Sequence, residues 1–162
     1  HNISEDEIVK LQKVFFIAQI KLAEKLKLPI IIHNRSSADD VLEILIEQNY
    51  KNFVFHCYSE DLEYTKKLLK FAPDCMLGFG WVVTFKSALW VQEAAKNIPL
   101  KNIMIETDCP YLTPTPHRGK QENEPIYVKH VLSKIIDLGT EDSETITKEI
   151  FENSKDFFNI PL

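Results

Sequence analysis

The chain has 162 residues, of which 44% are hydrophobic and 27% charged, and its formal net charge is −5 at pH 7. This length and composition suffice for one globular domain with its own core, and the acidic balance argues against a protein coated in basic surface for nucleic acid. A locally basic groove, or phosphate capture by a bound metal, stays compatible with these totals. No apolar run approaches the ~20 residues of a membrane span, so we expect no membrane partner.

The cysteines bear on the cellular compartment. Cys57, Cys75 and Cys109 are an odd number with no CxxC spacing, which favours a reduced, intracellular environment. The start of the sequence also lacks the layout of a signal peptide. We therefore expect a cytoplasmic protein, with the nucleus as the alternative compartment.

The first predicted element is a long amphipathic helix that runs to about Lys27. Ser4 and Glu7 have the spacing of a capping box at its start. Apolar residues then recur at helical spacing and define the helix's apolar stripe: Ile8, Leu11, Phe15, Ala18, Leu22 and Leu26.

Four short, strand-like apolar segments follow, starting near residues 29, 52, 75 and 102. Each interval has the length of one strand, one helix and two short loops. We expect the intervening helices to open at Ser36 or Ser37, at Ser59–Asp61 and near Ser87. Such regular alternation predicts parallel strands joined by right-handed crossovers.

The chain changes character after the fourth strand. Residues 109–125 contain four prolines and the stretch His117–Lys120, which together predict a rigid loop carrying positive charge. Pro125 can serve as the first residue of a helix that Gly139 closes. One or two short helices should follow, from Asp142 to about residue 158.

Three of the strand-like segments end in side chains that bind metals. His33 and His56 end the first two, while Glu106 and Asp108 follow the run Ile103–Ile105. Carboxylates at the end of a buried strand are costly unless a cation receives them. Side chains alternate along a strand, so Glu106 and Asp108 should share one face.

We therefore expect His33, His56 and Asp108 to hold a common metal ion. Imidazole suits Zn, Mn, Fe or Co, and carboxylate suits these and Mg. Asp108 could also accept the proton of a metal-bound water, whose pKa the ion lowers from ~15.7 to ~7. Glu106 should support the site as a partner of Arg35 or of a lysine.

The remaining polar residues near these strand ends have alternative roles. Arg35 could receive a substrate phosphate or pair with Glu106, and Arg118 and Lys120 could meet a phosphodiester backbone. For each loop cation taken singly, solvation at the surface is the commoner role. Cys57 follows His56 directly and should face the other way, which argues against a Cys–His nucleophilic pair.

Two architectures fit the alternating elements: a doubly wound sheet and a (β/α) barrel. A barrel places its active site at the carboxyl ends of its strands, whereas an open sheet uses a single switch point. Functional side chains at the ends of several strands favour the α/β barrel of the TIM type.

Six segments resemble the TatD family, in order and over nearly the whole chain. The resemblance implies a metal-dependent hydrolase on a TIM-type barrel, related to the amidohydrolases and generally described as a deoxyribonuclease. By resemblance, His33 and His56 correspond to histidine ligands, and Asp108 to the aspartate ligand, of a centre with two divalent ions (Mg, Mn or Zn). The segments are Pro29–Arg35, Phe55–Ser59, Val83–Lys86, Ile105–Leu112, Pro114–Lys120 and Asn123–Pro125.

The sequence also departs from the family's pattern. TatD-like proteins use a His-x-His pair on the first strand and a glutamate on a later one, and neither is present in this sequence. A barrel typically needs ~250 residues. We therefore expect residues 1–162 to be a single, N-terminally truncated barrel domain, the C-terminal two-thirds of a TatD protein, lacking roughly three βα units. Its open edges should lead to self-association or require the missing segment.

The expected function is that of a TatD-type deoxyribonuclease, which cleaves the phosphodiester bonds of DNA with a metal-activated water. Two alternatives stay open. One is an amidohydrolase-like enzyme acting on a small molecule, against which the basic stretch Arg118–Lys120 argues mildly. The other is a non-catalytic remnant that works through a partner, which the missing ligands favour and the retained ones disfavour.

Overall fold

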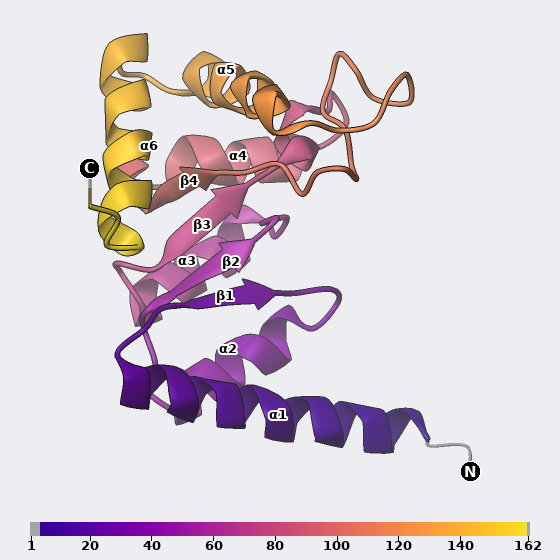
Figure 1. Cartoon of the computed structure of the whole chain (residues 1–162), viewed down its shortest axis with the longest axis vertical. Coiled ribbons are helices and arrows are strands. Elements are labelled where there is room, and N and C mark those ends of the chain that lie inside the picture. Colours follow the sequence, from indigo (N-terminus) through magenta and orange to yellow (C-terminus); the bar gives the residue numbers. More distant parts are fainter. Residues whose placement is uncertain (1–3, 162) are drawn as a thin grey trace.

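A parallel β-sheet forms the centre of the fold, in a computed structural model that describes residues 4–161 (Figure 1). In this part of the chain the sheet has four strands in the order β1-β2-β3-β4. The α/β class and the parallel sheet expected from the sequence are confirmed. The strands are β1 (Ile30–His33), β2 (Phe53–His56), β3 (Met76–Phe79) and β4 (Ile103–Ile105).

Helices connect the strands and follow the last one. Figure 1 shows α1 and α2 beside β1, and α5 and α6 beyond β4, at the other end of the sheet. Three 3₁₀ turns also occur among the described residues, η1 (Trp81–Thr84), η2 (Leu100–Asn102) and η3 (Pro125–Tyr127). The α-helices are α1 (Glu5–Leu26), α2 (Ala38–Glu47), α3 (Leu62–Phe71), α4 (Leu89–Asn97), α5 (Val128–Leu138) and α6 (Ser143–Phe157).

Side chains cap the starts of α1, α3 and α6, as the sequence predicts. The capping box of Ser4 and Glu7 opens α1, and the Asp61 carboxylate accepts from the amide of Tyr64 at the start of α3. The start of α2 differs from the prediction. Ser37 occupies the cap position without a capping side-chain bond, and Asn34 Oδ1 instead accepts from both the amide and the hydroxyl of Ser37.

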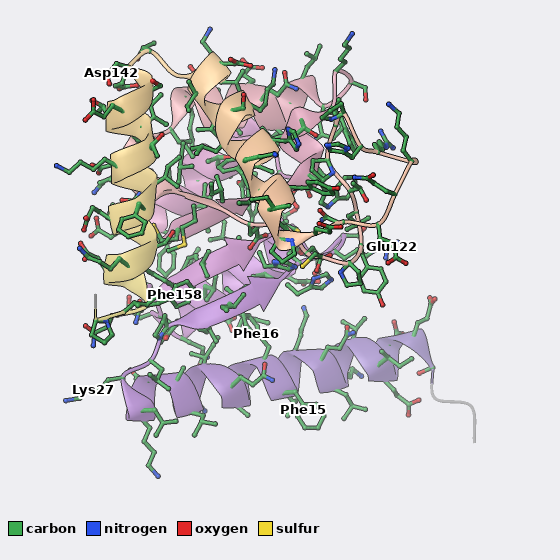
Figure 2. All side chains as sticks on the ribbon, turned by 45° about the horizontal axis from the view of Figure 1, so that its top comes forward. Phe15, Phe16, Lys27, Glu122, Asp142 and Phe158 are labelled. Atoms are coloured by element: carbon green, nitrogen blue, oxygen red, sulfur yellow. The ribbon has the colours of Figure 1, made fainter. Side chains whose placement is uncertain are left out.

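The apolar stripe that defines α1 in the sequence lies largely in solvent. Phe15 is 63% exposed and Leu22 55% exposed. The buried residues of α1 are Ile20 and Ala23, which lie on another side of the helix. Figure 2 shows Phe16 directed toward the sheet and Phe15 directed away from it. Because α1 carries two apolar faces, periodicity alone could not identify the one that packs.

An open groove lies between α1, β1 and α2. Its volume is about 840 Å³, and its lining includes Phe16, Ile31, His33 and Arg35. Within residues 4–161, β1 pairs only with β2, so its other edge is unpaired, and Ile31 on β1 is 61% exposed. Exposed apolar side chains beside a free strand edge are typical of a surface that another strand covers.

The core lies between the sheet and the helices that follow its strands. Phe53, Phe55 and Phe79 are completely or almost completely buried, and Phe55 meets the rings of Phe53 and Tyr58 edge to face. The C-terminal α6 is tied to this core by Asn153, whose amide donates to the carbonyls at Leu100 and Ile103. No helix in residues 4–161 combines the length and apolar character needed to cross a membrane.

We expect Phe55→Ala to lower the free energy of unfolding by about 3–5 kcal/mol, because it leaves a cavity in a closely packed core. Phe15→Ala is the matched control, since most of this side chain already lies in solvent, and should cost no more than about 0.5 kcal/mol. Urea denaturation followed by circular dichroism measures both. Equal losses in the two variants would contradict the packing described for α1.

Candidate metal centre

The register of the sheet places two histidines side by side at its carboxyl edge. His33 and His56 are the last residues of β1 and β2, and they are direct partners in the parallel ladder. Their ring centroids are 6.0 Å apart. Parallel strands end at the same edge, so the two apolar runs deliver both imidazoles to one region.

Glu106 and Asp108 reach this edge by a route that strand alternation did not predict. β4 ends at Ile105, and Asp108 has a left-handed backbone with φ of 63°, so the expectation that both carboxylates lie on one continuing strand face is wrong. Both nevertheless approach the ring of His56. Glu106 Oε1 lies 2.8 Å from Nδ1, and Asp108 Oδ1 lies 3.6 Å from Nε2.

These two distances assign different roles to the two carboxylates. If Nδ1 carried no proton, its lone pair would face the negatively charged carboxylate of Glu106 at 2.8 Å, which is unfavourable. In the neutral ring the proton therefore resides on Nδ1, where it can be donated to Glu106. This leaves the Nε2 lone pair of His56 free on the side of Asp108. Orientation of a metal-binding histidine through its second nitrogen is a general property of metal sites.

The distance between His56 Nε2 and Asp108 Oδ1 fits a shared cation. At 3.6 Å the two atoms are farther apart than in an ordinary hydrogen bond. Two ligands that each lie ~2.1 Å from one tetrahedral ion are separated by about 3.4 Å. An imidazole and a carboxylate suit a divalent metal, so His56 and Asp108 fit such a group. Among the described residues, His33 does not join them in a cluster with all donor atoms within 4.8 Å of one another.

Glu106 does not pair with Arg35 or with a lysine, contrary to the expectation from sequence. In the described part of the chain its partners are His56 Nδ1 and the backbone amide of Cys57, which donates to Oε1. Glu106 therefore bridges β4 to the end of β2. Arg35 instead lines the groove beside His33.

Cys57 also departs from strand alternation. Its backbone is left-handed, with φ of 48°, and its Sγ falls in a cluster with His56 and Glu106 whose donor atoms lie within 4.8 Å of one another. The expectation that it faces away from His56 is thus wrong. Burial, followed by the charge of Glu106, raises the pKa of Cys57 well above its ordinary value. A neutral thiol is a poor nucleophile and a poor ligand.

Asn123 organises the turn that presents Asp108. Its side chain is buried, and its amide nitrogen donates to the carbonyl of Tyr111 at 2.7 Å. Its backbone amide donates to the carbonyl of Pro110, and the amide of Tyr111 donates to the carbonyl of Asp108. Asn123 lies in the motif Asn123–Pro125, but its role was not predictable from the sequence, because a buried asparagine carries no periodicity.

The basic loop folds back onto η1 at the carboxyl edge of the sheet (Figure 1). The amide of Thr115 donates to Thr84 Oγ1, and the guanidinium of Arg118 lies 3.7 Å from the ring centroid of Phe85. Lys120 is exposed. His117 stacks on Tyr127, with their ring centroids 4.4 Å apart.

Comparison with known proteins connects this site to a family. The profile of the family described as TatD related DNase matches residues 1–159. A curated relative from Bacillus subtilis, named "Uncharacterized metal-dependent hydrolase YabD", is 43% identical over 152 residues, which cover 93% of this chain and 58% of the relative. A metal-dependent hydrolase from Buchnera aphidicola is 38% identical, with 94% and 57% covered.

Solved structures share the fold. The crystal structure of YJJV, a TatD homolog from Escherichia coli, superposes with a TM-score of 0.88 at 24% identity, covering 98% of this chain and 61% of that one. An uncharacterized amidohydrolase from Saccharomyces cerevisiae gives a TM-score of 0.78 at 18% identity, with 92% and 60% covered. The chain thus spans less than two-thirds of the length of the proteins it matches.

Asn123→Ala should loosen the turn around Asp108, because it removes the buried amide that donates to the carbonyl of Tyr111. We expect a loss of about 1–3 kcal/mol in stability and faster hydrogen exchange at the amide of Tyr111. The matched control is Thr113→Val, which removes an exposed bond from the same loop to the carbonyl of Gln121. Unchanged exchange at Tyr111 in the Asn123 variant would show that this side chain does not hold the turn.

Proposed function

Because the chain belongs to the TatD family of metal-dependent hydrolases, we propose that its sheet edge holds divalent metal and serves the hydrolysis of phosphodiester bonds in DNA. The orientation of His56 carries the proposal. One ring nitrogen is held by Glu106, and the other is left free at 3.6 Å from Asp108. This arrangement gives a metal ion a neutral imidazole and a carboxylate at a separation that one ion can bridge.

The proposed ligands are His33, His56 through Nε2, and Asp108, and the proposed metals are Mg²⁺, Mn²⁺ or Zn²⁺, two in an intact site. A bound divalent cation supplies Lewis acidity and an activated water at neutral pH. Glu106 keeps the His56 ring oriented, and a carboxylate oxygen of Asp108 accepts the proton of the attacking water. The turn closed by Asn123 holds that carboxylate beside the ring.

The cations near the strand ends support a phosphodiester substrate over a small uncharged one. Arg118 is fixed against Phe85, and its loop is tied to η1 through Thr115, so its charge is presented at little conformational cost. Lys120 lies on the same loop, and Arg35 follows the proposed ligand His33 by two residues. Contacts of this kind bind the phosphate backbone without reading base sequence.

We further propose that the chain corresponds to the C-terminal part of a TatD barrel and lacks roughly three βα units. The curated relatives are longer, since this chain covers only 57–58% of the two described above. The free edge of β1 and the groove beside α1 offer the surface on which such units would pack. They would also bring the family's remaining ligands, either within a longer polypeptide or through association.

We place the protein in the cytoplasm, with the nucleus as the alternative, because Cys57, Cys75 and Cys109 are all free thiols.

A direct assay of nucleotide release from DNA separates the nuclease from the two alternatives, the small-molecule hydrolase and the non-catalytic remnant. Zn²⁺ binding without release of nucleotides from DNA would favour the remnant.

Asp108→Asn tests the metal-assisted step, since it keeps the shape of the side chain and removes its charge. We expect nucleotide release from single-stranded DNA in Mg²⁺ or Mn²⁺ to fall at least ~100-fold, and a chelator to abolish it. Asp74→Asn is the matched control, because Asp74 makes only an exposed ion pair with Lys101. Equal activity in the parent and the Asp108 variant would contradict the proposed metal-dependent hydrolysis.

Arg118→Gln tests the phosphate contact. Binding of single-stranded DNA, measured by fluorescence anisotropy over a series of salt concentrations, should weaken at low salt. The slope of log K against log salt should become shallower by about 1. Lys101→Gln removes a cation just before the amino end of β4 and should leave the slope unchanged. An unchanged slope for Arg118→Gln would remove this residue from the DNA-binding surface.

A further inference from the structure

We infer that Gly78 is a positioning residue of the proposed metal centre: its missing side chain leaves the space in which the Glu106 carboxylate orients His56. The inference rests on the proposed function, because it concerns how one proposed ligand is prepared for a metal. Gly78 itself is proposed to contact neither a metal-binding atom nor a substrate. Gly78 acts on His56 through Glu106.

Gly78 lies on β3, between the strand that carries His56 and the strand that leads to Glu106. A Cβ atom built on Gly78 would lie 2.9 Å from Glu106 Oε2 and 3.0 Å from Glu106 Cδ. It would also lie 3.1 Å from the carbonyl oxygen of Phe55 on β2. Any side chain at position 78 would therefore overlap the carboxylate where it now sits.

The carboxylate would move, because it is the flexible partner in this overlap. The carbonyl of Phe55 belongs to a buried strand of the sheet and cannot shift far without disturbing its pairing. Glu106 holds its carboxylate at the end of rotatable bonds. A substitution at Gly78 thus requires the Phe55 carbonyl to give by only a few tenths of an ångström, while the closer overlap displaces the carboxylate that contacts His56.

Displacement of Glu106 removes two contacts at once. Its Oε1 lies 2.8 Å from His56 Nδ1 and accepts from the amide of Cys57. Without the carboxylate, nothing described at this position keeps the proton on Nδ1. The ring then has the mixture of tautomers expected of a histidine whose nitrogens face water, and Nε2 is no longer reserved for a metal.

Gly80, which directly follows β3, has a different environment. A Cβ on Gly80 would lie 3.4 Å from Cys57 Sγ and 3.9 Å from Glu106 Cγ, which are ordinary contact distances. Neither glycine has a positive φ, so both positions accept an L side chain in their backbone conformation. Gly80→Ala is therefore a matched control that adds the same methyl group two residues away.

The first readout is the tautomer of His56 in the metal-free protein, measured by nitrogen-15 NMR of the neutral imidazole ring in alkaline buffer. The parent and Gly80→Ala should show protonated Nδ1 and bare Nε2. Gly78→Ala and Glu106→Ala should both shift the population toward protonated Nε2. Addition of Gly78→Ala to Glu106→Ala should change nothing further, because both act through one carboxylate. Retention of the parent tautomer in Gly78→Ala overturns the inference.

The second readout is the affinity for Zn²⁺, measured by calorimetry. We expect Gly78→Ala to weaken binding by about 10–100-fold and Gly80→Ala to leave it within about 3-fold. A parent protein that binds no Zn²⁺ contradicts the proposed metal centre, while the NMR result still decides the role of Gly78. These failures are thus distinguishable.

Thermal unfolding provides the check on folding. If Gly78→Ala destabilises the chain through Glu106, the double variant Gly78→Ala/Glu106→Ala should melt within a few degrees of Glu106→Ala alone. Failure of the double variant to fold would place the overlap at the Phe55 carbonyl and overturn the inference.

Discussion

The site depends on the contact between Glu106 and His56, which joins the end of β4 to the end of β2 across the intervening strand. A carboxylate at 2.8 Å from one ring nitrogen decides where the proton resides, and so which nitrogen can bind a cation. The same carboxylate accepts from the amide of Cys57, which ties it to the backbone. The orientation of the ring is therefore built into the sheet.

Two features away from the ring make that contact possible. The sheet must leave space for the carboxylate, and it does so at Gly78, where a side chain would overlap Glu106. The loop after β4 must turn back toward His56, and it does so through the left-handed backbone of Asp108 and the bonds made by Asn123. Strand pairing supplies the scaffold, while these local features supply the precision that metal binding needs.

The strand framework was predictable because its signals are local and repeated. Apolar runs at regular spacing predicted parallel strands, and strand ends predicted that His33 and His56 would meet. The orientation of Cys57 and the partner of Glu106 were not predictable, because Cys57 is itself left-handed and Glu106 lies just beyond β4, where the regular alternation of side chains ends. The packed face of α1 was also mispredicted, since the helix has two apolar faces and the sequence does not say what covers each.

X-ray absorption spectroscopy of the protein loaded with Zn²⁺ tests the central claim most directly. His56 Nε2, His33 and Asp108 would give a shell of nitrogen and oxygen atoms at about 2.0–2.1 Å, with no sulfur. The competing cluster of His56, Cys57 and Glu106 would add a sulfur shell at about 2.3 Å. A shell of nitrogen and oxygen alone is the result we expect, and a sulfur ligand would contradict the account of how Glu106 orients His56.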